Sequence, residues 1–170
     1  KDKDQVLELE DRTKGGSVPK DYHKAVLQGV KEAALNGSIA GYKVIDFHLK
    51  LLDGSYHEVD SSEMAFRIAG SIAAKAVLQK ARPVLLEPVM RLELVTPGEF
   101  LGAVLGDLGR RRASIKNIEG EADIQAVHAR IPLGESFGYA NTLRSLTQGR
   151  ANYSLEFDDY EKAPDGVAVA

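Results

Sequence analysis

The sequence contains no cysteine, which excludes disulfides, thiolate zinc sites and cysteine nucleophiles. It also lacks an apolar run of about 18 residues, the length that a membrane-spanning helix needs, and its charged start is unlike a signal peptide. No phosphate-binding loop of the form G-x-x-x-x-G-K-[ST] occurs, so the chain should not hydrolyse GTP or ATP by itself. These absences permit a cytoplasmic protein in a reducing environment, and we expect the chain to hold no cofactor of its own.

The composition is that of an ordinary folded protein. The 170 residues are 44% hydrophobic, which suits one domain or two small ones. The formal net charge of -3 argues against a general nucleic-acid coat, although a local basic patch can still contact RNA.

The first half of the chain, residues 1–84, predicts alternating strands and helices. Apolar residues alternate over 43–52, which indicates a strand with one wet face. Two strands cover two helices poorly, so we expect this half to be an incomplete sheet domain. The expected order is a strand at 6–11, a helix from Pro19 to Asn36, a strand at 43–52, and a helix to about 82 with Met64, Ile68, Ile72 and Ala76 along one stripe.

The second half, residues 87–161, follows a proline-containing linker at 82–88 and predicts a ferredoxin-like βαββαβ module. Thr96 and Glu99 have capping-box spacing, and we expect the glycines at 98, 102 and 106 to allow close backbone packing. Residues 162–170 are expected to form a disordered tail. The predicted elements are a strand at 89–95, a helix through Leu108, strands at 115–118 and 124–131, a helix at 133–147, and a strand at 151–157.

The stretch Asp53–Phe66 joins a strand to a helix with a tight turn and a short polar loop. Asp53-Gly54 is a strong turn signal. Asp60, Ser61 or Ser62 can cap the helix, and Asp60 has the capping-box spacing to Glu63. His57 is therefore expected on an exposed loop that points away from the core.

Two enzymatic alternatives are weak. Residues 134–138 fit the G-x-S-x-G pattern of serine hydrolases around Ser136, but all four histidines precede the serine, whereas the hydrolase order needs one after it. His48 and His57 lack the paired spacing of zinc enzymes, so no metal site and no catalytic residue are predicted.

Arg110, Arg111 and Arg112 stand together at a predicted helix end. Three guanidinium groups there can neutralise phosphates, or they can satisfy the terminal carbonyls and the helix dipole. The residues alone leave both uses open.

Several stretches resemble the C-terminal part of elongation factor G, the bacterial-type translational GTPase. They are residues 15–22, 41–46, 52–66, 86–90, 106–111, and 137–150 in part, and they span nearly the whole chain in the right order.

The resemblance implies two α+β modules. Residues 1–84 would be the later part of the fourth domain, an incomplete ribosomal-protein-S5-like arm, and 87–161 the ferredoxin-like fifth domain. It implies a fragment of a ribosomal translocase, with GTP and Mg bound by the N-terminal domains that this chain lacks. The implied partners are rRNA, the tRNA and mRNA, and stalk-base proteins of the ribosome, together with those missing domains.

In that family the loop matching residues 53–61 forms part of the arm tip, which implies tRNA or mRNA contacts for Gly54, Ser55, Tyr56 and His57. A histidine can bond ribose and phosphate without carrying a large charge. The arginines 110–112 are the candidate rRNA contacts. Gly109 and Ala113 depart from the family pattern, so a paralogue acting in ribosome recycling or rescue is the alternative.

Overall fold

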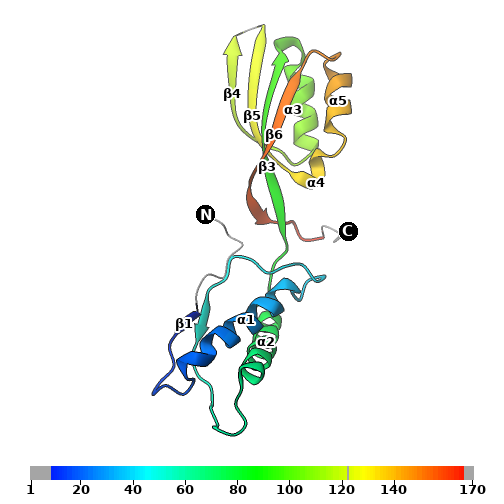
Figure 1. The fold of residues 1–170 in the computed structure, drawn as a ribbon. Coiled ribbons are helices and arrows are strands. Elements are labelled where there is room, and N and C mark those ends of the chain that lie inside the picture. The colour runs from blue at the N-terminus through cyan, green and yellow to red at the C-terminus, as the bar shows by residue number, and fades with distance from the viewer. Residues whose placement is uncertain (1–8, 122, 167–170) are drawn as a thin grey trace. The chain divides into compact units, whose positions relative to one another are not determined.

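The structure is a computed structural model that describes residues 9–121 and 123–166. The chain divides into two compact units with the boundary between Val84 and Leu85 (Figure 1). Each unit combines helices with a sheet, so the protein is α+β. The expected strand residues 6–8 and the last four residues of the expected tail lie outside the described part.

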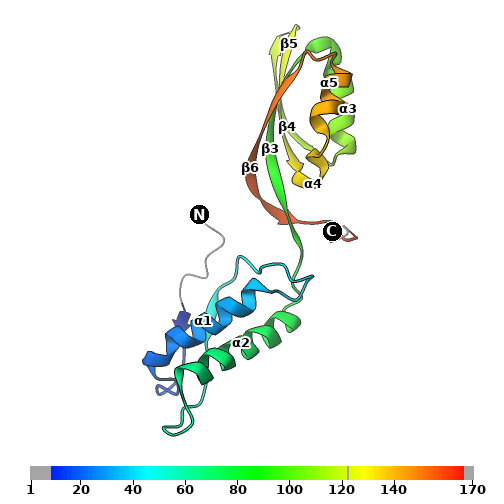
Figure 2. The ribbon, with the colours of Figure 1, turned by 45° about the vertical axis from the view of Figure 1, so that its right-hand side comes forward.

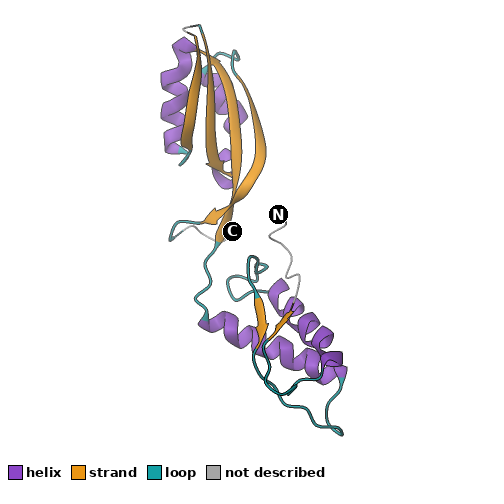
Figure 3. Cartoon of the chain, turned by 90° about the vertical axis from the view of Figure 1, so that its left-hand side faces the viewer, coloured by secondary structure: helices purple, strands orange, loops and turns teal. Residues whose placement is uncertain are grey.

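The first unit has the expected order of strand, helix, strand, helix. β1 and β2 are parallel, with Leu9 opposite Leu49, and lie beside the two helices (Figure 3). A short 3-10 turn precedes α1. The elements are β1 (Leu9–Asp11), η1 (Lys20–Tyr22), α1 (His23–Leu35), β2 (Leu49–Leu51) and α2 (Glu63–Lys80).

The two helices of this unit cross at glycines. A Cβ added to Gly29 of α1 would lie 1.9 Å from the carbonyl oxygen of Arg67 in α2, and one on Gly70 would lie 2.6 Å from the carbonyl oxygen of Val26. The backbones therefore approach more closely than any side chain at these positions would allow. The core beside the crossing consists of Val18, Val26, Val30 and Phe66.

The predicted strand at 43–52 is wrong for most of its length. Asp46 has a φ of 57°, a left-handed conformation that interrupts an extended strand, and only Leu49–Leu51 pairs. The predicted alternation of faces still holds, because Phe47, Leu49 and Leu51 pack against the core. Side-chain alternation therefore extends beyond the hydrogen-bonded strand.

The apolar stripe of α2 is exposed among the described residues. Met64, Ile68 and Ile72 are 61%, 51% and 63% exposed. Only Phe66 and Gly70 of this helix are buried, and both lie on the side that packs against α1 and the core. The sequence pattern identified the helix, but not the face that packs.

The second unit has the expected βαββαβ order. Its antiparallel sheet has the strand order β4-β5-β3-β6, and α3 and α5 lie on one face of it (Figure 2). The predicted hairpin is confirmed by pairing of Glu121 with Ile124. The elements are β3 (Leu86–Pro97), η2 (Gly98–Phe100), α3 (Leu101–Arg110), β4 (Ser114–Glu121), β5 (Ile124–Pro132), α4 (Leu133–Ser136), α5 (Tyr139–Leu146) and β6 (Asn152–Lys162).

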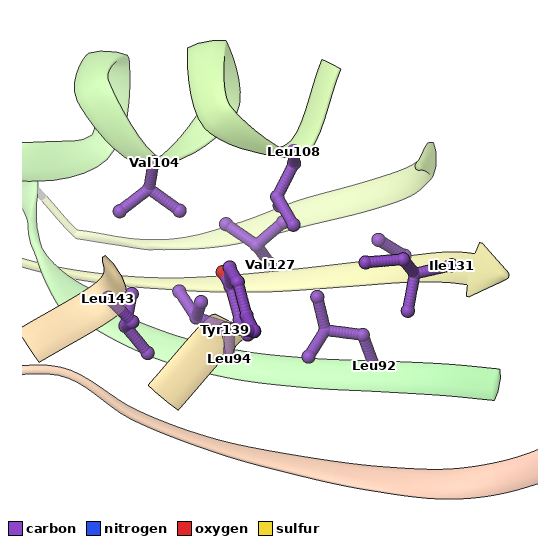
Figure 4. Packing of buried hydrophobic residues seen from close by; sticks show 9 residues of the cluster. Leu92, Leu94, Val104, Leu108, Val127, Ile131, Tyr139 and Leu143 are labelled. Carbon is purple, nitrogen blue, oxygen red and sulfur yellow. The ribbon is translucent and has the colours of Figure 1, made fainter. Parts of the chain in front are cut away.

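The core of this unit lies between the sheet and its two long helices. Alternate residues of the central strands β3 and β5 meet residues spaced four apart on each helix (Figure 4). Full burial of such side chains stabilises a domain by roughly 1.5–3 kcal/mol each. The largest members are Leu92, Leu94, Val104, Leu108, Val127, Ile131, Tyr139 and Leu143.

Four expectations for the second unit are corrected. Thr96 makes no capping box, since Pro97 precedes the helical turn without a side-chain cap. The predicted helix 133–147 breaks where Phe137 is extended and Gly138 takes a φ of 72°. No other group lies within 4 Å of a Cβ placed on Gly102 or Gly106, so these glycines do not mediate close packing. Finally, the tail does not begin at 162.

Residues 162 and 163 belong to the folded unit because they continue the sheet. Lys162 is the last residue of β6 and pairs with Leu86. Ala163 is 4% exposed, and its amide donates to the carbonyl of Leu85 at 2.9 Å. The linker predicted at 82–88 is likewise partly strand, since β3 begins at Leu86.

Candidate functional site

The loop between β2 and α2 extends beyond the ends of both helices of its unit (Figure 1). We call residues 53–61 the tip loop. Its first turn is fastened at Asp53, whose Oδ1 accepts hydrogen bonds from the Gly54 amide at 2.8 Å and the Ser17 hydroxyl at 3.2 Å. A Cβ on Gly54 would lie 2.4 Å from Cγ2 of the buried Val18. Any larger residue at 54 would displace the loop.

Tyr56 joins the tip loop to the body of the unit through aromatic rings. Its ring centroid lies 5.8 Å from that of Tyr22, and the Tyr22 ring stacks on Phe66 at 4.5 Å. Tyr56 is 39% exposed. Desolvation raises the pKa of its phenol above the ordinary value, and Tyr22 and Glu58 raise it further. The phenol therefore stays neutral at physiological pH.

His57 follows directly and is held only by its backbone. Its amide donates to the Ser61 hydroxyl at 3.0 Å, and its carbonyl accepts from the Ser61 amide at 2.9 Å. No hydrogen bond or ion pair of the imidazole is found within the described part of the chain. The structure thus presents an exposed ring on a fastened backbone, which leaves both ring nitrogens available to a ligand.

The helix after the loop is capped at Ser62 rather than Asp60. The Ser62 hydroxyl accepts from the Ala65 amide at 3.1 Å, the bond that an N-cap residue makes. The predicted pairing of Asp60 with Glu63 is therefore wrong, although Ser62 was among the three candidates.

Arg111 is engaged within the second unit. Its guanidinium donates to Asp107 Oδ2 at 2.8 Å, to the Glu135 carbonyl at 2.6 Å and to the Thr142 hydroxyl at 3.0 Å. It also lies 5.2 Å from the ring centroid of Tyr139. The Arg111 side chain is 18% exposed. Arg111 therefore ties the end of α3 to the segment that carries α4 and α5.

The neighbouring arginines differ from Arg111. Arg112 lies just past Arg111, the C-cap residue of α3, and has a φ of 59°. Its guanidinium pairs with Glu87 and lies 3.8 Å from a carboxylate oxygen of Glu135. Arg110 is exposed, and its guanidinium makes no ion pair or hydrogen bond with another described residue. Of these three arginines, only Arg110 has a guanidinium without a partner among the described residues.

Ser136 has no catalytic surroundings. Its hydroxyl donates to the Leu133 carbonyl at 2.8 Å within α4. His128 is the one histidine of this half of the sequence. It alternates with the buried Val127 and Ala129, so it lies on the sheet face away from the helices. Among the described residues, no histidine therefore lies beside the Ser136 hydroxyl, where the base of such a nucleophile would stand.

The described residues contain neither a metal-binding cluster nor a helix that could cross a bilayer. No three histidine, aspartate or glutamate side chains gather closely enough to hold an ion within 9–121 and 123–166. Among the helices of these ranges, none combines the length and the apolar character of a membrane span.

Two supporting residues of the tip loop had no clear signal in the sequence. Tyr22 falls within the helix expected from Pro19 to Asn36, and Ser61 is only one of three residues expected to cap the next helix. Tyr22 contacts the loop from a segment distant in the sequence, and Ser61 bonds within a loop that has no repeating pattern. Helical or strand periodicity reports neither.

Family models match both halves of the chain. One, described as elongation factor G, domain IV, matches residues 1–82, and another, described as elongation factor G C-terminus, matches residues 84–169. The elongation factor G proteins of Thermotoga neapolitana and Thermotoga petrophila are 49% and 51% identical over 162 residues. These alignments cover 95% of this chain and 23% of each relative.

A solved structure agrees with these matches. A crystal structure of a protein from Thermus thermophilus is 46% identical, with a TM-score of 0.87. The match covers 94% of this chain and 24% of that one. The chain thus spans about a quarter of the length of the proteins that it matches.

Proposed function

The chain belongs to the elongation factor G family of translation elongation factors, and from this premise we propose that it serves as the arm and adjoining module of a ribosomal translocase. The factor promotes GTP-dependent movement of tRNA and mRNA on cytoplasmic ribosomes. The tip loop enters the decoding region during that movement, and the chain contributes contacts rather than a chemical step.

The presentation of His57 carries this proposal. An exposed imidazole on a backbone held at both its amide and its carbonyl can reach a ribose hydroxyl or a phosphate without a large loss of chain entropy on binding. Contacts of this kind recognise the shape of an RNA helix rather than its sequence. A translocase needs recognition that is independent of sequence, because it acts on every codon.

Arg110 supports a second contact, with rRNA, in the fifth-domain module. Its exposed guanidinium can neutralise a phosphate, whereas Arg111 and Arg112 are held by partners within the unit. Ribosomal proteins at the stalk base and the other domains of the same factor complete the proposed partners.

GTP and Mg bind outside this chain. The sequence has no phosphate-binding loop, and the described residues have no acidic cluster for a metal. The residues present do not fit the nucleotide, so no step of GTP hydrolysis is assigned to them.

The test separates movement from hydrolysis in a full-length factor that contains this chain. Replacing His57 by Ala should slow single-turnover translocation by at least tenfold while ribosome-stimulated GTP hydrolysis changes less than twofold. Equal losses in both would contradict the arm-tip role. Normal translocation accompanied by slower ribosome splitting would favour the recycling paralogue instead.

A further inference from the structure

The tip loop is fastened by two partly exposed residues, one before and one after His57 in the chain. Tyr22 belongs to η1 and is only partly exposed, and Ser61 is the last residue before the helix cap. Resting on the proposed function, we propose that Tyr22 and Ser61 are positioning residues that set the direction of His57 before the ribosome is met.

Ser61 acts on the backbone of His57. The Ser61 hydroxyl accepts the His57 amide, and the Ser61 amide donates to the His57 carbonyl. These two bonds close residues 57–61 into one turn, so the direction of the imidazole depends on Ser61. Without the hydroxyl, the His57 amide is exposed and bonds to water. The unit therefore still folds while the turn opens more often.

Tyr22 acts through the residue before His57. Its ring contacts both the Tyr56 ring, against which it is tilted, and the Phe66 ring, on which it stacks. We call these three rings the aromatic column. Phe66 is 8% exposed and belongs to the core of the unit. The column therefore extends the rigidity of the core out to the residue that precedes His57.

The consequence is a preorganised contact. A loop that already holds its bound conformation loses little conformational entropy on binding, so loosening it should slow the step in which His57 takes part and leave other steps unchanged. Loss of one neutral hydrogen bond should slow the step by about two- to tenfold.

Ser61 and Ser62 offer a matched pair of variants in the full-length factor. Ser61→Ala removes the bond to His57, whereas Ser62→Ala removes only the helix cap. Ser61→Ala should slow single-turnover translocation about two- to tenfold, and Ser62→Ala should leave it within twofold. Equal slowing by both variants would show a general stability effect and overturn the assignment.

The aromatic column is tested by a size series at residue 22. Tyr22→Leu removes the ring and should slow translocation, whereas Tyr22→Phe keeps the stack and should restore most of the rate. Ribosome-stimulated GTP hydrolysis should be the same for both. A Phe variant as slow as the Leu variant would overturn the role of the ring stack.

Coupling to His57 decides whether the two residues act through it. In a His57→Ala background, Ser61→Ala and Tyr22→Leu should cause no further slowing, because the imidazole that they position is no longer present. Full additivity would overturn the positioning role. If His57→Ala alone were without effect, the proposed function would fail first, whereas slowing by His57→Ala with none from Ser61→Ala would refute only the positioning role.

Discussion

The crossing of α1 and α2 predicts that replacing Gly29 by Ala destabilises the first unit. The new Cβ would stand 1.9 Å from the Arg67 carbonyl oxygen, far inside the 3.4 Å at which ordinary contact begins. Because the obstacle is backbone rather than a flexible side chain, the helices must separate. The separation loosens the packing of Val30 and Phe66.

Two opposing terms set the magnitude. Overpacking costs about 1–3 kcal/mol, and a rigid backbone obstacle places Gly29→Ala at the upper end. The better helix propensity of alanine returns about 1 kcal/mol. The net expectation is a loss of about 2 kcal/mol, equivalent to an about thirtyfold larger equilibrium constant for opening.

Hydrogen exchange followed by mass spectrometry measures this loss in peptides of α1 and α2 separately from the rest of the chain. Gly106→Ala is the matched control, since its Cβ meets nothing within 4 Å on an exposed position of α3. It should slow exchange in its own helix, because alanine gains about 1 kcal/mol over glycine there. Slower exchange in α1 of Gly29→Ala would refute the close crossing.

Three further predictions concern charged side chains. Arg111→Ala should lower the unfolding free energy of the second unit by about 2–3 kcal/mol in urea titration. The change removes a charged donor and leaves its hydrogen-bond acceptors without a partner. Arg110→Ala should change it by less than about 0.5 kcal/mol and weaken ribosome binding more at low salt than at high salt. Bonding to Arg67 holds the pKa of the Glu32 carboxyl below its ordinary value. Its contribution to stability should therefore be complete at pH 7 and lost as pH falls below about 4.5 through the folded pKa. Glu32→Gln should flatten that dependence in urea midpoints measured from pH 7 to 3, and a wild-type midpoint that rises on acidification relative to Glu32→Gln would contradict the pairing.

The sequence predicts elements whose residues repeat along one face. The order of the second unit follows from such patterns, because buried residues alternate in β3 and recur every four residues in α3. The exposure of His57 also follows from turn and cap signals. These features depend on local chemistry that one sequence displays.

Features that depend on two distant segments could not be read in this way. Gly29 and Gly70 look like any helical glycines until the helices are placed together. Arg111 looks like its neighbours until α4 and α5 supply its partners. Likewise, no pattern in the sequence predicts the left-handed conformation of Asp46, which shortens β2.

The most direct test of the arm-tip role asks what His57 touches. A photo-crosslinking amino acid is placed at position 57 of the full-length factor, which is then trapped on the ribosome during translocation, with position 110 labelled in parallel as a control. We expect crosslinks from position 57 to tRNA, mRNA or small-subunit decoding RNA, and from position 110 to other rRNA. Crosslinks from position 57 confined to large-subunit RNA, or none at all, would contradict that role.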